Sequence, residues 1–242
     1  QHLLHCKREY RLDFKLIRLD RHITVQVLRI GIPSAIQYSL FAIANLFVQS
    51  AVNTFDHVVV EGNSAAVNAD SIVFDMMSAF YTASTSFIAQ NYGAGHKKRI
   101  LKVYGITTLY SFSLGLILGV LLVIFRMPFL SLFTTDPDVL YYGSVRLMIM
   151  GLSYSNSAFM DNATAAARGI GRSIAPTVIV ISGSVILRIT WIYTIFAYFK
   201  TLPSLYLLYV CSWFVTALAG NLYFFHSYRK LPEHNPIKKV HI

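Results

Sequence analysis

The chain has 242 residues, of which 55% are hydrophobic and only 13% charged, and its mean hydropathy is +0.53. Soluble globular domains carry about a quarter charged residues, so this composition excludes an ordinary soluble domain and predicts a protein solvated largely by lipid. The net charge of +10 could indicate nucleic-acid binding, but cytoplasmic loops of membrane proteins carry the same excess. Cys6 and Cys211 lie too far apart in the sequence to indicate a disulfide framework or a metal site.

Six stretches hold enough apolar residues, about 20, to cross a hydrocarbon core. In chain order they are residues 30–55, 63–92, 103–125, 140–167, 174–198 and 205–225. These stretches are too long for barrel strands, and lipid tolerates only helices and closed barrels, so the predicted fold is an all-α membrane protein with a six-transmembrane-helix bundle. Gly115 and Gly119 in the third stretch have the small-xxx-small spacing of close helix contacts, although this face could also meet lipid.

The connectors and the charges predict how the spans are oriented. Residues 55–57, 134–138 and 200–203 carry turn formers, and short connectors make neighbouring spans antiparallel. Most of the 21 Lys and Arg residues precede the first span or come after the second, fourth and sixth, whereas the opposite side has only Arg126 and Lys200. The positive-inside rule therefore predicts a multi-pass cell-membrane protein with both termini in the cytoplasm, and no nucleic-acid partner is needed to explain the charge.

The basic leader before the first span has a helical pattern of its own. Between residues 12 and 28, Leu12, Leu16, Leu19, Ile23 and Val27 recur at helical spacing among basic residues, which predicts an interfacial amphipathic helix; a solvated linker is the alternative. The chain starts at Gln1 without a signal-peptide run, so we interpret it as cut from a longer chain. The expected organisation is a cytoplasmic segment over 1–29, a six-helix lobe over 30–226 and a cytoplasmic tail over 227–242.

No P-loop, HExxH, GxSxG or His/Cys cluster is present in the sequence, so we expect no enzyme, no metal and no cofactor. Ionisable residues at lipid depth are the functional candidates, since they cost several kcal/mol unless they face a bundle interior or water. Asp161 lies in a polar stretch of the fourth span, where a carboxylate could bind a proton or Na⁺ and exchange it for a cationic ligand. An ion pair or cap with Arg168 or Arg188 is the structural alternative.

Asp70 and Asp75 lie in the second span. Five residues separate them by about 140° on an α-helix, so they cannot both line one face, and we expect one to be functional and the other structural. Arg188 in the fifth span needs a partner, for which Asp161 or Asp75 is the natural candidate. Arg146 lies near a helix end, and we expect it to snorkel.

Polar and aromatic residues of the first span are candidates for a cavity. Gln37, Asn45, Gln49 and Asn53 form one polar stripe, which faces either a water-filled cavity or hydrogen-bonding neighbours. Pro33, with Gly31 beside it, should restrict or bend the start of this span. Several aromatic residues could contact a flat cation, although packing explains most of them equally well; they are Tyr38, Phe41, Phe74, Phe80, Tyr81 and Tyr154.

Three motifs then indicate a family. Residues 29–37 (RIGIPSAIQ) open the first span, residues 90–95 (QNYGAG) with Arg99 close the second, and residues 161–173 (DNATAAARGIGRS) with Pro176 come next in order. Together these motifs resemble the C-terminal six-helix lobe of multidrug and toxic compound extrusion (MATE) transporters, and the resemblance covers residues 22–228.

The resemblance implies a 12-helix antiporter of two six-helix lobes, which exports cationic, often aromatic compounds in exchange for H⁺ or Na⁺. The partners are then the lipid bilayer, small cationic organic substrates and a missing N-terminal lobe, and the leader is similar to the loop that joins the lobes. Two departures stand out: the first span lacks the carboxylate of some members, and Ser157 stands where others carry Asp, one turn before Asp161.

From these considerations we predict Asp161, Asp75 and Asp70 as cation or proton sites, and Gln37, Tyr38, Asn45, Asn156 and Arg188 as substrate-cavity residues. Two alternatives stay open. A flippase of the wider superfamily would move lipid-linked saccharides with cavity arginines, of which Arg146 and Arg188 are the candidates at membrane depth. A truncated remnant or assembly partner would not transport at all.

Overall fold

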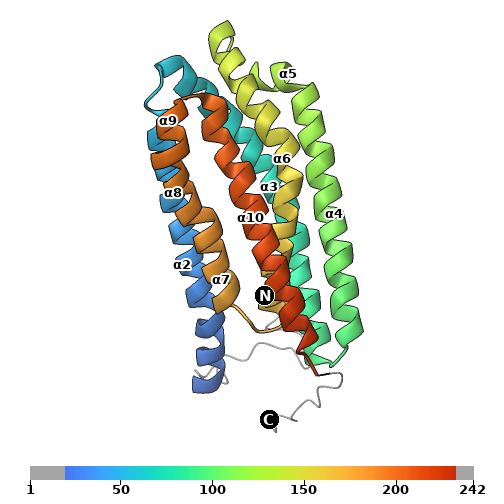
Figure 1. Ribbon diagram of the computed structural model, residues 1–242. Helices are drawn as coiled ribbons and strands as arrows, with labels where there is room; N and C mark the ends of the chain where they lie inside the picture. The colour runs from blue at the N-terminus through green and yellow to red at the C-terminus, as the bar shows by residue number, and fades with distance from the viewer. Residues whose placement is uncertain (1–19, 233–242) are drawn as a thin grey trace, which may run out of the picture.

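A computed structural model describes residues 20–232, and every regular element in that range is helical (Figure 1). Six long helices form one bundle: α2 (Arg21–Val52), α3 (His57–Gly93), α4 (Lys97–Ile124), α6 (Pro137–Gly169), a fifth helix built from α7 to α9, and α10 (Leu202–Arg229). A short α5 (Arg126–Leu130) comes directly after α4. All six predicted stretches are helical, although α2 ends at Val52, three residues before the end of the first predicted stretch.

Five of the six long helices are long and apolar enough to cross a membrane. The exception, α6, has a similar length but a more polar sequence, and it lies among the other helices instead of on their outside. Its composition therefore reflects burial in protein, where small and polar side chains are tolerated and useful.

The predicted connectors are confirmed as the ends of helices. The Asp136 side chain accepts hydrogen bonds from the backbone N–H of Asp138 and Val139, and Pro137 takes the first helical position of α6. Thr201 and Ser204 form a capping box at the start of α10. Both arrangements satisfy backbone donors that a helix start leaves open.

The start of the first span differs from the sequence prediction. Residues 12–19 of the predicted amphipathic helix lie outside the described range, and from Arg21 onward a single helix, α2, continues to Val52 without a break at Pro33. A proline inside a helix leaves the carbonyl four residues earlier without its donor. Here that carbonyl belongs to Arg29, and the hydroxyl of Ser173 donates to it at 3.0 Å, which explains why the helix continues.

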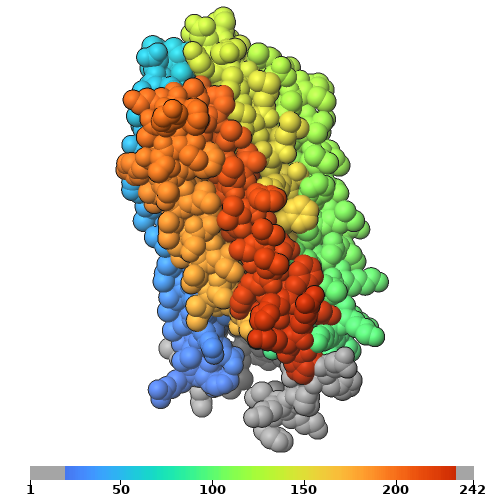
Figure 2. Space-filling view, in the orientation of Figure 1, coloured from blue at the N-terminus to red at the C-terminus, as the bar shows by residue number. Residues whose placement is uncertain are grey.

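The fifth helix changes its winding along its length. The α-helical segments α7 (Ile174–Val180), α8 (Leu187–Trp191) and α9 (Ala197–Phe199) alternate with π-helical stretches over Ile181–Ile186 and Ile192–Phe196. Short π-helical stretches inside α-helices are frequent at functional sites. In Figure 1 the three labelled segments form one continuous rod beside α2, and Figure 2 shows this rod flank to flank with α10.

Close backbone contacts hold α6 against its neighbours α3, α4 and α10. A Cβ atom added to Gly119 would lie 1.9 Å from the carbonyl oxygen of Gly151, and one added to Gly62 would lie 2.7 Å from the carbonyl oxygen of Val139. At Gly115 the nearest atoms belong to Met77 and Ser155. The small-xxx-small pair of the third span therefore faces α6, not lipid.

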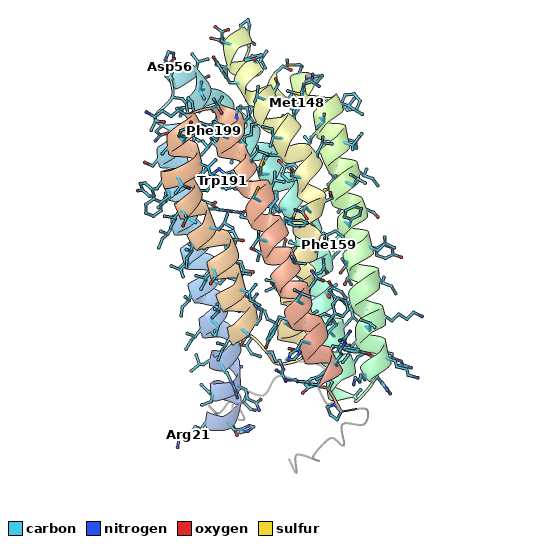
Figure 3. All side chains as sticks on the ribbon, in the orientation of Figure 1. Arg21, Asp56, Met148, Phe159, Trp191 and Phe199 are labelled. Atoms are coloured by element: carbon cyan, nitrogen blue, oxygen red, sulfur yellow. The ribbon has the colours of Figure 1, made fainter. Side chains whose placement is uncertain are left out.

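Basic residues gather at one end of the bundle. The start of α2, the connection from α3 to α4, the connection from α6 to α7 and the end of α10 all lie there (Figure 1). Arg21 and Asp56 mark the two opposite ends in Figure 3. The antiparallel arrangement predicted from the short connectors is thus present, and it brings the basic clusters together.

Candidate functional site

A cavity of about 660 Å³ lies between α2 on one side and α3, α6, α8 and α10 on the other. This volume falls within the roughly 300–1,000 Å³ of sites for small organic ligands. The polar or charged residues in its lining include Gln37, Asn45, Asp161, Arg168 and Arg188. It is the natural place to look for function, because it joins intramembrane charges with open space.

One face of α6 supplies the polar floor of the cavity. Asp161, Thr164, Ala165 and Arg168 all line it. Their spacings of three, one and three residues repeat on one side of an α-helix. Asp161 and Arg168 are two turns apart, roughly 10 Å along the helix axis, so the two charges share a wall without forming a pair.

Asp161 is the carboxylate of this lining. It is half-buried, and within residues 20–232 no side chain or backbone group donates a hydrogen bond to it. The single ion pair of that range joins two other residues, Arg146 and Asp70. A carboxylate in a cavity with free lone pairs can take up a cation or a proton.

Arg168 connects α6 to α2 across the basic end of the cavity. Its Nη2 donates to the side-chain oxygen of Gln37 at 2.8 Å. Its Nε is enclosed and has no hydrogen-bond partner among the described residues. One side of the guanidinium is therefore fixed, and a buried donor still lacks an acceptor.

Arg188 lies on α8 at the opposite wall and is only 2% exposed. Its Nε donates to Ser212 at 3.1 Å, and its Nη1 donates to Asn45 at 3.3 Å. The guanidinium also lies 4.6 Å from the ring centroid of Tyr209 and 5.0 Å from that of Phe41. The predicted carboxylate partner, Asp161 or Asp75, is wrong: neutral acceptors and aromatic faces hold this arginine instead.

Aromatic side chains complete the lining. Trp213 meets Phe74 edge to face at a centroid distance of 5.6 Å and Tyr209 at 5.7 Å. Tyr38, Phe41 and Tyr81 contribute from α2 and α3. Such walls accept flat rings by stacking or edge contacts.

Asp70 occupies a different place. It pairs with Arg146 inside the contact between α3 and α6, and the Tyr154 hydroxyl donates to its other oxygen. Arg146 is 2% exposed and also donates to Asn63 at 2.8 Å. The expectation that Arg146 snorkels is wrong, because Asp70 lies opposite it within the bundle.

Two further predicted residues lie outside the cavity. Asp75 is exposed on α3, so Asp70 and Asp75 do occupy different faces, as their spacing predicted. Asn156 points toward α10, where its amide nitrogen lies 3.5 Å from the carbonyl oxygen of Val210. The cavity brings together Asp161, Gln37, Tyr38, Asn45 and Arg188 from the predicted set.

The cavity residues that sequence reasoning did not propose include Arg168, Tyr209 and Trp213. Arg168 could have been found, because it stands seven residues after Asp161 and so shares its helix face. Tyr209 and Trp213 are likewise four residues apart on α10, but nothing in an uncharged span indicates which face meets a cavity.

Comparisons of the sequence and of the fold with known proteins point to the same family. A MatE family model matches residues 33–194. A probable multidrug resistance protein NorM of Thermotoga maritima is 24% identical over 154 residues, which cover 64% of this chain and 33% of that protein. YoeA of Bacillus subtilis, also a probable multidrug resistance protein, is 28% identical over 178 residues, or 72% of this chain and 38% of that one.

A solved outward-facing structure of a multidrug resistance MATE transporter superimposes with a TM-score of 0.84 and 20% identity. The match covers 94% of this chain and 52% of that structure, so this chain spans about half of a MATE transporter structure and about a third of its curated relatives. The fold is therefore that of one six-helix lobe. On the match of the family model to most of the helical bundle, the chain belongs to the MatE family of membrane transporters.

Proposed function

We propose that the protein at its natural length is a secondary active exporter of aromatic organic compounds. In this proposal the lobe forms one wall of a central cavity, and a second six-helix lobe forms the other. Asp161 in the cavity lining is the observation that carries the proposal. An intramembrane carboxylate without a protein donor is costly to keep unless it performs a task.

The task we assign to Asp161 is to bind the coupling cation, H⁺ or Na⁺. With a cation bound the carboxylate is neutral toward the cavity, and without it the carboxylate adds a negative charge to a wall that also holds Arg168 and Arg188. The two forms therefore favour different packings of the surrounding helices. A binding difference of this kind can shift a transporter between inward-open and outward-open states, which rocking of two lobes produces.

Asp161 is a better candidate than the other two predicted carboxylates. Asp70 is already neutralised by Arg146, and Asp75 is outside the cavity lining. The distribution of charge further supports an orientation with the basic end of the bundle, including Arg21 and Arg229, in the cytoplasm. The protein would then take its substrate from the cytoplasm and release it on the opposite side.

The test is transport of an aromatic dye by the protein at its natural length in proteoliposomes, driven by an imposed H⁺ or Na⁺ gradient. Asp161→Asn should abolish gradient-driven transport while leaving the yield and thermal unfolding midpoint of the protein unchanged. Asp138→Asn, at the exposed start of α6, is the matched control and should transport normally. Equal transport by wild type and Asp161→Asn would show that Asp161 does not bind the coupling cation. No transport by the wild type under either gradient would favour a module that does not transport.

A further inference from the structure

We propose that the cavity selects aromatic compounds that carry an anionic group, a carboxylate or a phosphate, and that Arg188 and Arg168 bind this group. The proposal rests on the proposed export function and names the charge of its substrate. It departs from the cationic substrates that the family resemblance implies. Its basis is the set of charged side chains that this lobe directs into the cavity.

The charge balance of the cavity wall is positive. Its lining contains two arginines, Arg168 and Arg188, and one carboxylate, Asp161. Even with Asp161 ionised, as it is once the coupling cation has been exchanged for substrate, the two arginines leave the wall that faces the substrate with a net positive charge. A positive wall at low dielectric attracts an anion and repels an organic cation.

Arg188 is pre-organised to bind an anion. Ser212 and Asn45 fix two of its nitrogens, and Phe41 and Tyr209 lie close to the guanidinium. Among the described residues none accepts a hydrogen bond from its Nη2, although the side chain borders the cavity. A held guanidinium with free donors fits the planar, two-oxygen geometry of a carboxylate or phosphate.

Arg168 supplies a second site of the same kind. Gln37 fixes its Nη2, whereas its Nη1 has no acceptor in the described part of the chain and the side chain lines the cavity. A donor held at low dielectric without a partner gains free energy when something accepts its hydrogen bond. An anionic oxygen of a ligand would be such an acceptor.

The aromatic part of the ligand has a separate place. Phe74, Tyr209 and Trp213 form a connected aromatic cluster in the lining, and Tyr209 also lies against Arg188. A ring bound there would place its acidic substituent beside the guanidinium. The geometry thus favours a flat ring with an attached anionic group over a lipid anion, which has no ring to stack.

Two dyes that share a xanthene ring but differ in charge test this proposal. Binding of anionic fluorescein and of cationic rhodamine 123 to the protein at its natural length is measured by fluorescence anisotropy in detergent. Transport of both dyes is then measured in proteoliposomes. We expect fluorescein to bind about tenfold tighter than rhodamine 123, as expected for a charge-assisted contact.

Variants of Arg188 and Arg168 test whether these two residues cause the preference for the anionic dye. Arg188→Gln and Arg168→Gln should each weaken fluorescein binding by about tenfold and leave rhodamine binding equal or stronger. Arg188→Lys keeps the charge but not the planar guanidinium, so this variant should fold even if Arg188→Gln does not. Its affinity for fluorescein should fall between those of the wild type and Arg188→Gln. Arg126→Gln is the matched control, because Arg126 donates to Val123 outside the cavity.

The outcomes separate this proposal from the proposed function. Tighter binding and gradient-driven efflux of rhodamine 123, unaffected by the arginine variants, would overturn the anionic substrate and leave the exporter standing. Failure to bind or move either dye would overturn both. Displacement of fluorescein by farnesyl pyrophosphate at equal affinity would overturn the aromatic part and indicate a lipid-pyrophosphate cavity instead.

Discussion

The two halves of this lobe are held together in different ways. In the half formed by α3, α4, α6 and α10, backbones touch at glycines, and a charge pair, Asp70 with Arg146, is enclosed between helices. In the other half, α2 packs mainly on the α7–α9 helix and meets α3 only weakly. Side-chain hydrogen bonds connect α2 to its neighbours instead, through Gln37, Asn45 and the carbonyl of Arg29.

The comparison shows how one helix uses the same residue type for two purposes. Arg146 and Arg168 both come from α6. Arg146 has a carboxylate, an amide and two aromatic faces as partners, so its charge is used within the fold. Arg168 has one amide partner for its Nη2, and its Nη1 has no acceptor among the described residues although the side chain lines the cavity. The arginine that pairs with a carboxylate inside the bundle stabilises the lobe, and the arginine that lines the cavity without a carboxylate partner is available to a ligand.

The largest expected effect comes from breaking the enclosed pair. Asp70→Asn leaves Arg146 charged and unpaired, and removal of one partner of a buried pair costs about 3–5 kcal/mol. We expect a sharp loss of folded protein and a much lower unfolding midpoint in detergent. The double variant Asp70→Leu with Arg146→Met should recover much of this loss. A fully stable Asp70→Asn protein that no longer transports would instead make Asp70 a cation site.

A smaller effect is expected from the contact between α4 and α6. Gly119→Ala places a Cβ atom 1.9 Å from the carbonyl oxygen of Gly151, so the helices must separate, at a cost of about 1–3 kcal/mol. Gly105→Ala on the same helix is the control, since no atom lies within 4 Å of its added Cβ. Thermal unfolding should separate the two variants. Equal midpoints would mean that the backbones do not approach this closely.

In the half of the lobe that contains α2, Asn45→Leu should alter ligand binding more than stability. It removes the α2 acceptor of Arg188, and hydrogen bonds between transmembrane helices average about 0.6 kcal/mol. We therefore expect a two- to fivefold change in dye affinity, given that about 1.4 kcal/mol is tenfold, and almost no shift of the unfolding midpoint. Ser39→Ala, exposed on the same helix, should change neither quantity. A large loss of stability would assign Asn45 to packing.

The smallest effect is expected at Asp75, which belongs to neither the pair nor the cavity. The Asp75 side chain is exposed and has no hydrogen-bond or ion-pair partner among the described residues, so replacing it by Asn leaves no buried group unpaired. Asp75→Asn should therefore unfold like the wild type and transport within about twofold of it. A strong transport defect with normal stability would place Asp75 on the cation path, where the sequence also allowed it.

Sequence reasoning could predict the spans because lipid imposes a strong pattern. Long apolar runs, turn formers at residues 134–138 and one-sided basic clusters each reflect a physical constraint on a single segment. The fourth stretch, residues 140–167, was predicted from its count of apolar residues, although α6 is less apolar than the other five long helices.

The partners of the buried charges could not be predicted from the sequence. Which carboxylate meets Arg146 depends on how α3 and α6 are rotated and shifted against each other, and one residue of shift turns a helix by about 100°. The continuity of α2 through Pro33 was hidden for a similar reason, since the compensating donor, Ser173, lies 144 residues after Arg29 in the sequence. Contacts between distant segments decided both cases.

The π-helical stretches on either side of Arg188 change which residues of the fifth helix share a face. A π-helical turn holds more residues than an α-helical one, so Ile181–Ile186 and Ile192–Phe196 each shift the angular phase of the helical residues after them. A helical wheel drawn at about 100° per residue from Ile174 to Phe199 would assign Trp191 and Phe196 to incorrect sides. A π-helical stretch accommodates about one residue more than the α-helical winding it replaces, so deleting one residue within Ile181–Ile186 would restore ordinary winding and keep Arg188 on the side of Asn45.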